Sequence, residues 1–260
     1  MLLFSNMLAS LLTLRKRGEP PRVMAHRGGS ALSPENTLPA IREARRLEVD
    51  GIEIDVRRGK GGEILVIHDA TLDRTTSMRG RVSDYSRFNL RVHRTHIPTL
   101  REALRVAQPV PLMVEMKEAE MAIDVAEEVV KAKACDRACL MSFLTGGLRT
   151  AKRHFPEVIV GHLVKLSWRG QWPGVIRRTL DQALAIDARF ICVDAGGCSK
   201  LLADGAHRLG LPVWVWTVDR LETADRLAAM GVDGLISNDP EKIQAWSGVW
   251  QWTNATRKVR

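Results

Sequence analysis

The chain has 260 residues, 45% of them hydrophobic, which is enough for one sizeable core and allows one domain or two. Its 39 Lys and Arg residues outnumber 30 Asp and Glu residues, and the resulting net charge of +9 favours anionic substrates or partners. Aromatic residues make up only 5% and the basic residues form no long run, so a nucleic-acid-binding module is disfavoured.

Residues 1–20 form a segment of their own, in which apolar side chains recur at helical spacing. The apolar run is shorter than the roughly 20 residues that span a bilayer. Positive charges follow it instead of preceding it, which is atypical of a secretory signal. We expect an amphipathic helix that packs on the main domain, with contact to a membrane surface as the alternative. Its apolar face consists of Leu3, Phe4, Met7, Leu8, Leu11 and Leu12.

From residue 21 to residue 245, short apolar runs alternate with helical patterns, and no linker interrupts them. The expected strands are 22–26, 51–56, 63–68, 111–117, 138–143, 158–164, 190–194, 212–218 and 233–237. The expected helices are 35–48, 99–107, 120–133, 145–153, 173–187, 199–208 and 221–230. Alternation of this kind predicts parallel strands joined by helices, and its length favours a TIM (β/α)8 barrel. A tail rich in Trp and basic residues follows at 246–260.

One pair of strands departs from the alternation, since no helix fits between the apolar runs within 51–68. The intervening Gly59–Lys60–Gly61–Gly62 has the composition of a tight turn. We therefore expect a β-hairpin that places His68 opposite Ile54 and leaves eight strands for a parallel barrel.

Four cysteines, Cys135, Cys139, Cys192 and Cys198, form no CxxC pair and match no zinc-site spacing. So few cysteines in a chain of this length indicate a reducing compartment, and we expect the cytoplasm, with a peripheral position at the membrane as the alternative.

Charged and polar residues collect where the expected strands end, and in a barrel these ends meet at the catalytic face. They are His26, Arg27, Glu53, Asp55, His68, Asp69, Glu115, Lys117, Trp216 and Asp219. Glu53 and Asp55 share one face of their strand because strand side chains alternate. With Glu115 they bring three carboxylates together, and burying unpaired negative charge is costly. A divalent cation would offset that cost, and oxygen ligands favour Mg2+ or Ca2+.

The other members of this set suit a multiply anionic ligand. Arg27 can bind a phosphate group through its planar fork, and Lys117 can act as a point charge. His26 and His68 can exchange protons near neutral pH. Two further histidines, His93 and His96, lie in an Arg-rich segment in which we expect no helix, and we assign them no role.

Several motifs occur in a fixed order: "AHRGGS", "PENT", "GIEIDV", "GGEILVIHDATLDRTT", "IPTLREAL", "VEMK", "VWVWTVD" and "GVDGLISNDP". Together they resemble the glycerophosphodiester phosphodiesterase family, in particular its compact bacterial members, over about 23–240. The resemblance implies a metal-dependent TIM-barrel hydrolase that releases sn-glycerol 3-phosphate and an alcohol from small glycerophosphodiesters.

The resemblance also implies roles for individual residues. By position, His26 and His68 match the acid/base pair, and Glu53, Asp55 and Glu115 match the ligands of one divalent cation. The remaining matches, on the substrate side, are Arg27, Lys117, Trp216 and Asn36, of which Asn36 is expected to act from behind the ligands.

The segment between "LDRTT" and "IPTL" is shorter and more basic than is common in the family, which leaves the alcohol portion of the substrate open. Direct attack by water and attack by the substrate's own hydroxyl through a cyclic phosphate also remain alternatives, and the oligomeric state is open. A lysophospholipase D-type activity on membrane-derived lipids is an alternative function, because Trp168 and Trp172 are four residues apart after an expected strand. A non-catalytic phosphoester-binding module is disfavoured because every expected acid/base and metal-ligand position is present.

Overall fold

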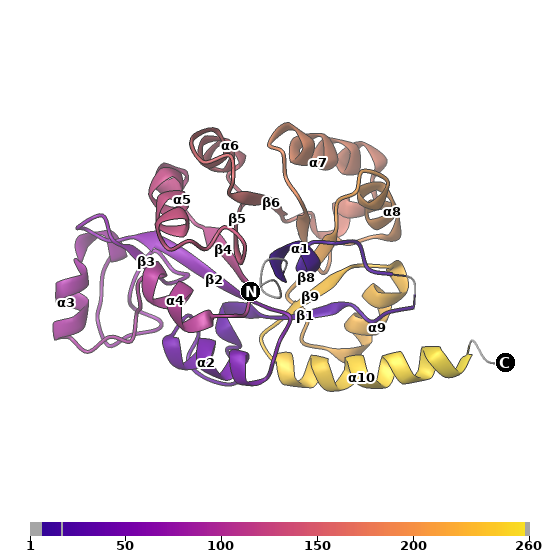
Figure 1. The fold of residues 1–260 in the computed structure, drawn as a ribbon, viewed down its shortest axis with the longest axis horizontal. Helices are drawn as coiled ribbons and strands as arrows, with labels where there is room; N and C mark the ends of the chain where they lie inside the picture. The colour runs from indigo at the N-terminus through magenta and orange to yellow at the C-terminus, as the bar shows by residue number, and fades with distance from the viewer. Residues whose placement is uncertain (1–6, 17, 258–260) are drawn as a thin grey trace.

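The computed structural model describes residues 7–16 and 18–257, with side chains as far as Gln251. It is a closed barrel of eight parallel strands with helices around it, as the sequence predicts (Figure 1). The strands are β1 (Arg22–Ala25), β2 (Gly51–Arg58), β3 (Ile64–Val66), β4 (Leu112–Met116), β5 (Ala138–Ser142), β6 (Ile159–Val164), β7 (Ile191–Asp194), β8 (Val213–Trp216) and β9 (Gly234–Ser237). The α-helices are α1 (Met7–Leu11), α2 (Leu38–Arg46), α3 (Arg87–Val92), α4 (Leu100–Ala107), α5 (Ala122–Lys131), α6 (Thr145–His154), α7 (Pro173–Ala185), α8 (Lys200–Arg208), α9 (Leu221–Met230) and α10 (Pro240–Arg257).

The barrel closes because β1 pairs in parallel with both β9 and β2. The additional strand β3, which is not part of the ring, pairs antiparallel with β2, with Val56 opposite Val66. The same register places His68 opposite Ile54, and the backbone N–H of Ile67 donates to the Asp55 carbonyl at 3.0 Å. The predicted hairpin is therefore confirmed.

Alternation along β2 separates the core from the site. Ile52, Ile54 and Val56 are fully buried in the layer between strands and helices. Glu53 and Asp55 point from the other face of the same strand into the barrel. A single strand thus contributes both to the hydrophobic layer and to the polar interior.

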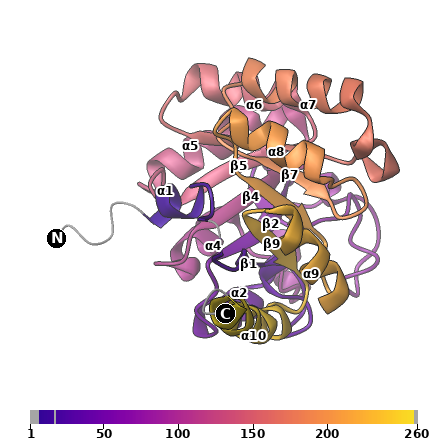
Figure 2. The same cartoon turned by 90° about the vertical axis from the view of Figure 1, so that its right-hand side faces the viewer.

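Helix α1 covers the end of the barrel opposite the site. Leu8 and Leu11 are 1% and 3% exposed and pack into the interior cluster that also holds Met113 and Trp214. Figures 1 and 2 show α1 over the N-terminal ends of the strands. The expected packing of the N-terminal segment is confirmed for these two leucines. Two other residues of its predicted face, Leu3 and Phe4, lie outside the described residues.

The C-terminal segment continues the last barrel helix without a break, since α10 runs across residue 245. Trp246 is buried, and its indole N–H donates to Asp225 at 2.8 Å. The Arg15 guanidinium lies 5.6 Å from the ring centre of Trp250, so the segment that follows α1 contacts α10. The side chains of residues 252–260 lie outside the described part of the chain. No helix among the residues placed by the structure is long and apolar enough to cross a membrane.

One expectation about the segment before α4 is wrong, because it contains the helix α3. Only Leu90 of this helix is buried, while Phe88 and Val92 are 73% and 60% exposed, so no apolar stripe marks it in the sequence. A reciprocal capping box between Ser86 and Asn89 stabilises its first turn instead.

Candidate active site

The first strand ends in a sharp turn that presents two functional side chains. His26, Arg27 and Gly28 form a short 3-10 turn in which Arg27 has φ 53° and Gly28 has φ 82°. A Cβ at Gly28 would lie 2.9 Å from that of Ala40, so both space and backbone conformation require glycine there. The close approach of this turn to α2 fixes His26 and Arg27 above the barrel interior.

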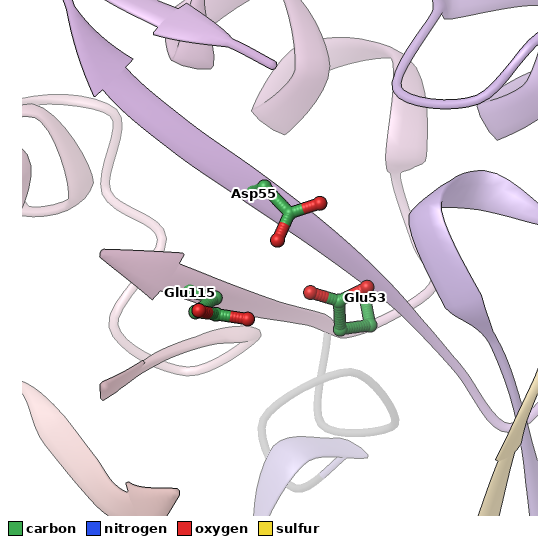
Figure 3. Close-up of side chains that lie close together, drawn as sticks. All are labelled: Glu53, Asp55 and Glu115. Atoms are coloured by element: carbon green, nitrogen blue, oxygen red, sulfur yellow. The ribbon is translucent and has the colours of Figure 1, made fainter. Parts of the chain in front are cut away.

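Three carboxylates converge at the catalytic end of the barrel. Glu53 and Asp55 come from β2 and Glu115 from the neighbouring β4, and Figure 3 shows their side chains together. One oxygen of each lies within 4.8 Å of one oxygen of the others. Their exposed fractions are 1%, 0% and 7%, so this negative charge is withdrawn from water.

Two fixed cations adjoin the carboxylates. The Lys117 ammonium lies 2.7 Å from Asp55 Oδ1 and 2.6 Å from Glu115 Oε1. The Arg27 guanidinium Nε lies 3.4 Å from Asp55 Oδ2, while the Arg27 backbone N–H donates to Glu53 at 2.9 Å. The cations thus concentrate on Asp55 and leave Glu53 with less compensation.

The pKa shifts follow this uneven compensation. Burial, reinforced by the charge of Asp55, raises the pKa of Glu115 to about 7 and that of Glu53 well above its ordinary value. Burial acts in the same direction on Asp55, but Lys117 and Arg27 outweigh it and lower the pKa of Asp55. Without a further positive charge, Glu53 and Glu115 therefore favour the protonated form more than an exposed carboxyl does.

The donor set fits one divalent cation. Glu53 Oε1 is buried and has no hydrogen-bond partner among the described residues, although it is aimed into the cluster. A buried carboxylate oxygen without a partner is costly unless something else satisfies it. Three carboxylates with all-oxygen donors could hold a hard cation at this point.

His26 is oriented by a chain of hydrogen bonds from β9. The Asn238 amide N–H donates to Asp219 at 2.8 Å, which turns Asn238 Oδ1 towards His26 Nδ1 at 2.7 Å. Nδ1 therefore carries the proton, and Nε2 faces Glu53 at 3.8 Å. Burial lowers the pKa of His26, so the neutral imidazole is favoured.

His68 has a different partner, namely a carboxylate. Its Nδ1 lies 2.7 Å from Asp69 Oδ1, and Arg74 holds Asp69 with a 2.6 Å hydrogen bond. Arg74 also donates to Glu35, which accepts from Arg27 at 2.9 Å. This network joins the two histidine-bearing loops through side chains alone.

An amide and an indole complete the set of predicted site residues. Asn36 donates to Asp55 at 2.8 Å and accepts from the Asp55 backbone N–H, so it holds that carboxylate from behind. Trp216 lines a cavity of about 80 Å³ and packs edge-on against Phe143 at 5.8 Å between ring centres.

The structure brings every predicted site residue to one end of the barrel. The cavity itself is lined by His26, Arg27, Glu53, His68, Glu115, Lys117 and Trp216, with Asp55 and Asn36 directly behind. Sequence reasoning gave no role to Asn238, Glu35 and Arg74. A polar residue directly after the last strand could have indicated Asn238, whereas the other two are visible only through contacts between loops.

These features define a TIM-barrel protein in which three buried carboxylates, two fixed cations and two histidines meet at one end of the barrel. The model of the Glycerophosphoryl diester phosphodiesterase family matches residues 26–242, and the chain belongs to this family of phosphoric diester hydrolases. A glycerophosphodiester phosphodiesterase of Caldanaerobacter subterraneus is 31% identical over 239 residues, covering 85% of this chain and 95% of that protein.

Solved structures share the fold. A glycerophosphodiester phosphodiesterase from Thermotoga maritima superposes with a TM-score of 0.75 at 24% identity, covering 86% of this chain and 97% of that one. A phosphodiesterase from Oleispira antarctica, solved in complex with the product sn-glycerol-3-phosphate, has a TM-score of 0.76 at 24% identity, with coverages of 87% and 96%.

Proposed function

We propose that this chain hydrolyses glycerophosphodiesters to sn-glycerol 3-phosphate and an alcohol, using one divalent cation and a histidine pair. The observation that carries the proposal is the buried carboxylate cluster, flanked by two cations and two histidines, in a barrel of this family. The product named for the Oleispira antarctica structure supports sn-glycerol 3-phosphate as the product here.

Glu53, Asp55 and Glu115 would hold the cation, and their oxygen donors favour Mg2+ or Ca2+. When bound, the cation supplies polarisation of the phosphoryl oxygens and lowers the pKa of an attacking oxygen. Arg27 and Lys117 would hold the non-bridging phosphate oxygens, and both already point at the cluster. Asn36 keeps Asp55 in place for this role.

The two histidines would share the proton transfers. His26, held neutral by burial with its Nε2 towards the cluster, is suited to accept the proton of the attacking oxygen. His68, beside the carboxylate of Asp69, is suited to hold the proton that the leaving alcohol needs. Trp216 would close the wall behind the substrate.

Calorimetric titration with Mg2+ and Ca2+ tests the metal assignment. Glu115→Gln should weaken binding of the preferred cation at least tenfold and lose most activity, because it removes one anionic ligand. Glu120→Gln is the matched control, since Glu120 is exposed and lies only five residues further along the chain. Equal metal affinity in both variants would overturn the assignment.

A second candidate is cleavage of lysophospholipids at the same site. Trp168 and Trp172 are 57% and 52% exposed after β6, with ring centres 5.0 Å apart. Phe143 and Leu144, at the end of the neighbouring β5, are 41% and 43% exposed. Apolar side chains at a barrel mouth could hold an acyl chain. Replacing both tryptophans by alanine should then lower the rate on lysophosphatidylcholine while leaving that on glycerophosphocholine unchanged. Equal effects on both substrates would contradict it.

A further inference from the structure

Two hollows that share lining residues lie outside the barrel mouth. Their volumes are about 600 and 390 Å³, and both are lined by Thr95, His96 and Ile97. The larger hollow also contacts His68 and Asn36, so the groove begins at the candidate active site. Its outer part lies beside α2, α3 and α4, which gather on one side of the barrel in Figure 1. We call the two hollows together the outer groove.

The outer groove is strongly cationic. Its charged lining residues are Arg42, Arg74, Arg87, Arg91, Arg94, Glu35 and Glu102. Arg74 is neutralised by Glu35 at 2.6 Å, and Arg87 by Glu102 at 2.8 Å. Both carboxylates of the lining are thereby paired, and three of its arginines have no carboxylate partner within the lining.

Those three arginines, Arg42, Arg91 and Arg94, make no side-chain hydrogen bond or ion pair with any residue that the structure describes. Arg94 lines the larger hollow, which contacts His68, while Arg42 and Arg91 line the smaller hollow. A concave surface with three uncompensated guanidinium groups attracts anions, and guanidinium binds phosphate oxygens in a bidentate manner. The remaining wall offers the hydroxyl groups of Thr75 and Ser77.

The position of His68 indicates which part of the substrate the outer groove would receive. His68 lines both the inner cavity and the outer groove, so it stands at the junction between them. In hydrolysis, water supplies the oxygen of the new P–O bond, the P–O bond to the alcohol breaks, and the alcohol oxygen takes up a proton. If His68 holds that proton, the alcohol portion of the substrate extends past His68 and into the groove.

We propose that the outer groove binds the alcohol portion of the substrate and favours glycerophosphodiesters whose alcohol carries a phosphate group of its own. This proposal rests on the proposed hydrolytic function and deepens it. The additional phosphate contacts Arg94 first, and longer anionic alcohols reach Arg91 and Arg42.

The experiment compares two substrates that differ by one phosphate, glycerophosphoinositol and glycerophosphoinositol 4-phosphate. At low ionic strength the wild-type chain should show a kcat/KM about tenfold higher for the phosphorylated substrate, and added salt should reduce this ratio. The triple variant R42A/R91A/R94A should bring the ratio close to one, because it removes the positive charges that would distinguish the two substrates. The control variant R153A removes an exposed arginine from α6, away from the groove, and should retain the wild-type ratio.

Calorimetric binding of inositol 4-phosphate, the alcohol that cleavage would release, provides a readout that does not depend on turnover. The triple variant should bind it at least fivefold more weakly than R153A. The groove assignment would be overturned if the two substrates had nearly equal kcat/KM in the wild-type chain, or if the triple variant kept the wild-type ratio of the two kcat/KM values. Neither result would contradict the proposed hydrolytic function. If neither substrate is cleaved with metal present, the proposed function fails instead, and the binding comparison still decides the groove.

Discussion

Leu8→Ala and Leu11→Ala test whether helix α1 is an integral part of the barrel core. Both side chains are almost fully buried among interior residues such as Met24 and Phe190. Truncating a buried leucine to alanine costs about 2–5 kcal/mol, because transfer free energy is lost and a cavity remains. For a chain of this size, about 3 kcal/mol corresponds to a decrease in Tm of about 6–12 °C.

Thermal and urea unfolding of the single variants would measure this cost. Leu14→Ala is the matched control, because Leu14 is 40% exposed and its truncation should stay within about 0.5 kcal/mol. At a temperature where all variants are folded, kcat/KM on glycerophosphocholine should stay close to the wild-type value, since α1 lies at the far end of the barrel. If Leu8→Ala and Leu11→Ala cost no more than Leu14→Ala, α1 is not part of the core. Loss of vesicle binding in these thermally neutral variants would then favour a membrane role for the segment.

Three further predictions concern proton transfer, pH and thiol reactivity. His26→Ala and His68→Ala should each lower kcat about 100-fold or more on glycerophosphocholine. A substrate with a p-nitrophenol leaving group needs little proton donation, so it should restore kcat more in the His68 variant than in the His26 variant. Equal restoration of kcat in both variants would contradict the assigned roles. Burial opposes ionisation of Glu102, but the Thr99 N–H and Arg87 outweigh it and lower its pKa. Glu102→Gln should therefore destabilise the fold at pH 7, and the difference should fade below about pH 4.5 as the wild-type carboxyl protonates; a pH-independent difference in urea midpoint would refute this. Native titration with a thiol reagent should label Cys135 first, because the other three thiols are buried; rapid labelling of all four would contradict the packing.

Much of the fold could be predicted because the signals are local or periodic. The alternation of strands and helices indicated the barrel, and the glycines between Arg58 and Glu63 indicated the β2–β3 hairpin. The carboxylate cluster could be predicted because Glu53 and Asp55 share a strand face and parallel strand ends meet at one end of a barrel.

What could not be predicted depends on contacts between distant segments. The pairing of His26 with Asn238 joins residues at opposite ends of the chain, and no periodicity reports it. The bridge from Glu35 to Arg74 depends on loop conformations that spacing does not fix. Helix α3 is stabilised by its cap and not by an apolar stripe, so its sequence resembles a loop.

Release of sn-glycerol 3-phosphate from glycerophosphocholine, measured before and after chelation, tests the central claim most directly. We expect turnover to cease in EDTA and to return when excess Mg2+ or Ca2+ is added, because the proposed function assigns the cation to the Glu53–Asp55–Glu115 cluster. The Glu115→Gln variant should not regain turnover at the same metal concentration. Undiminished turnover under chelation, or no release of sn-glycerol 3-phosphate with either metal present, would contradict the account.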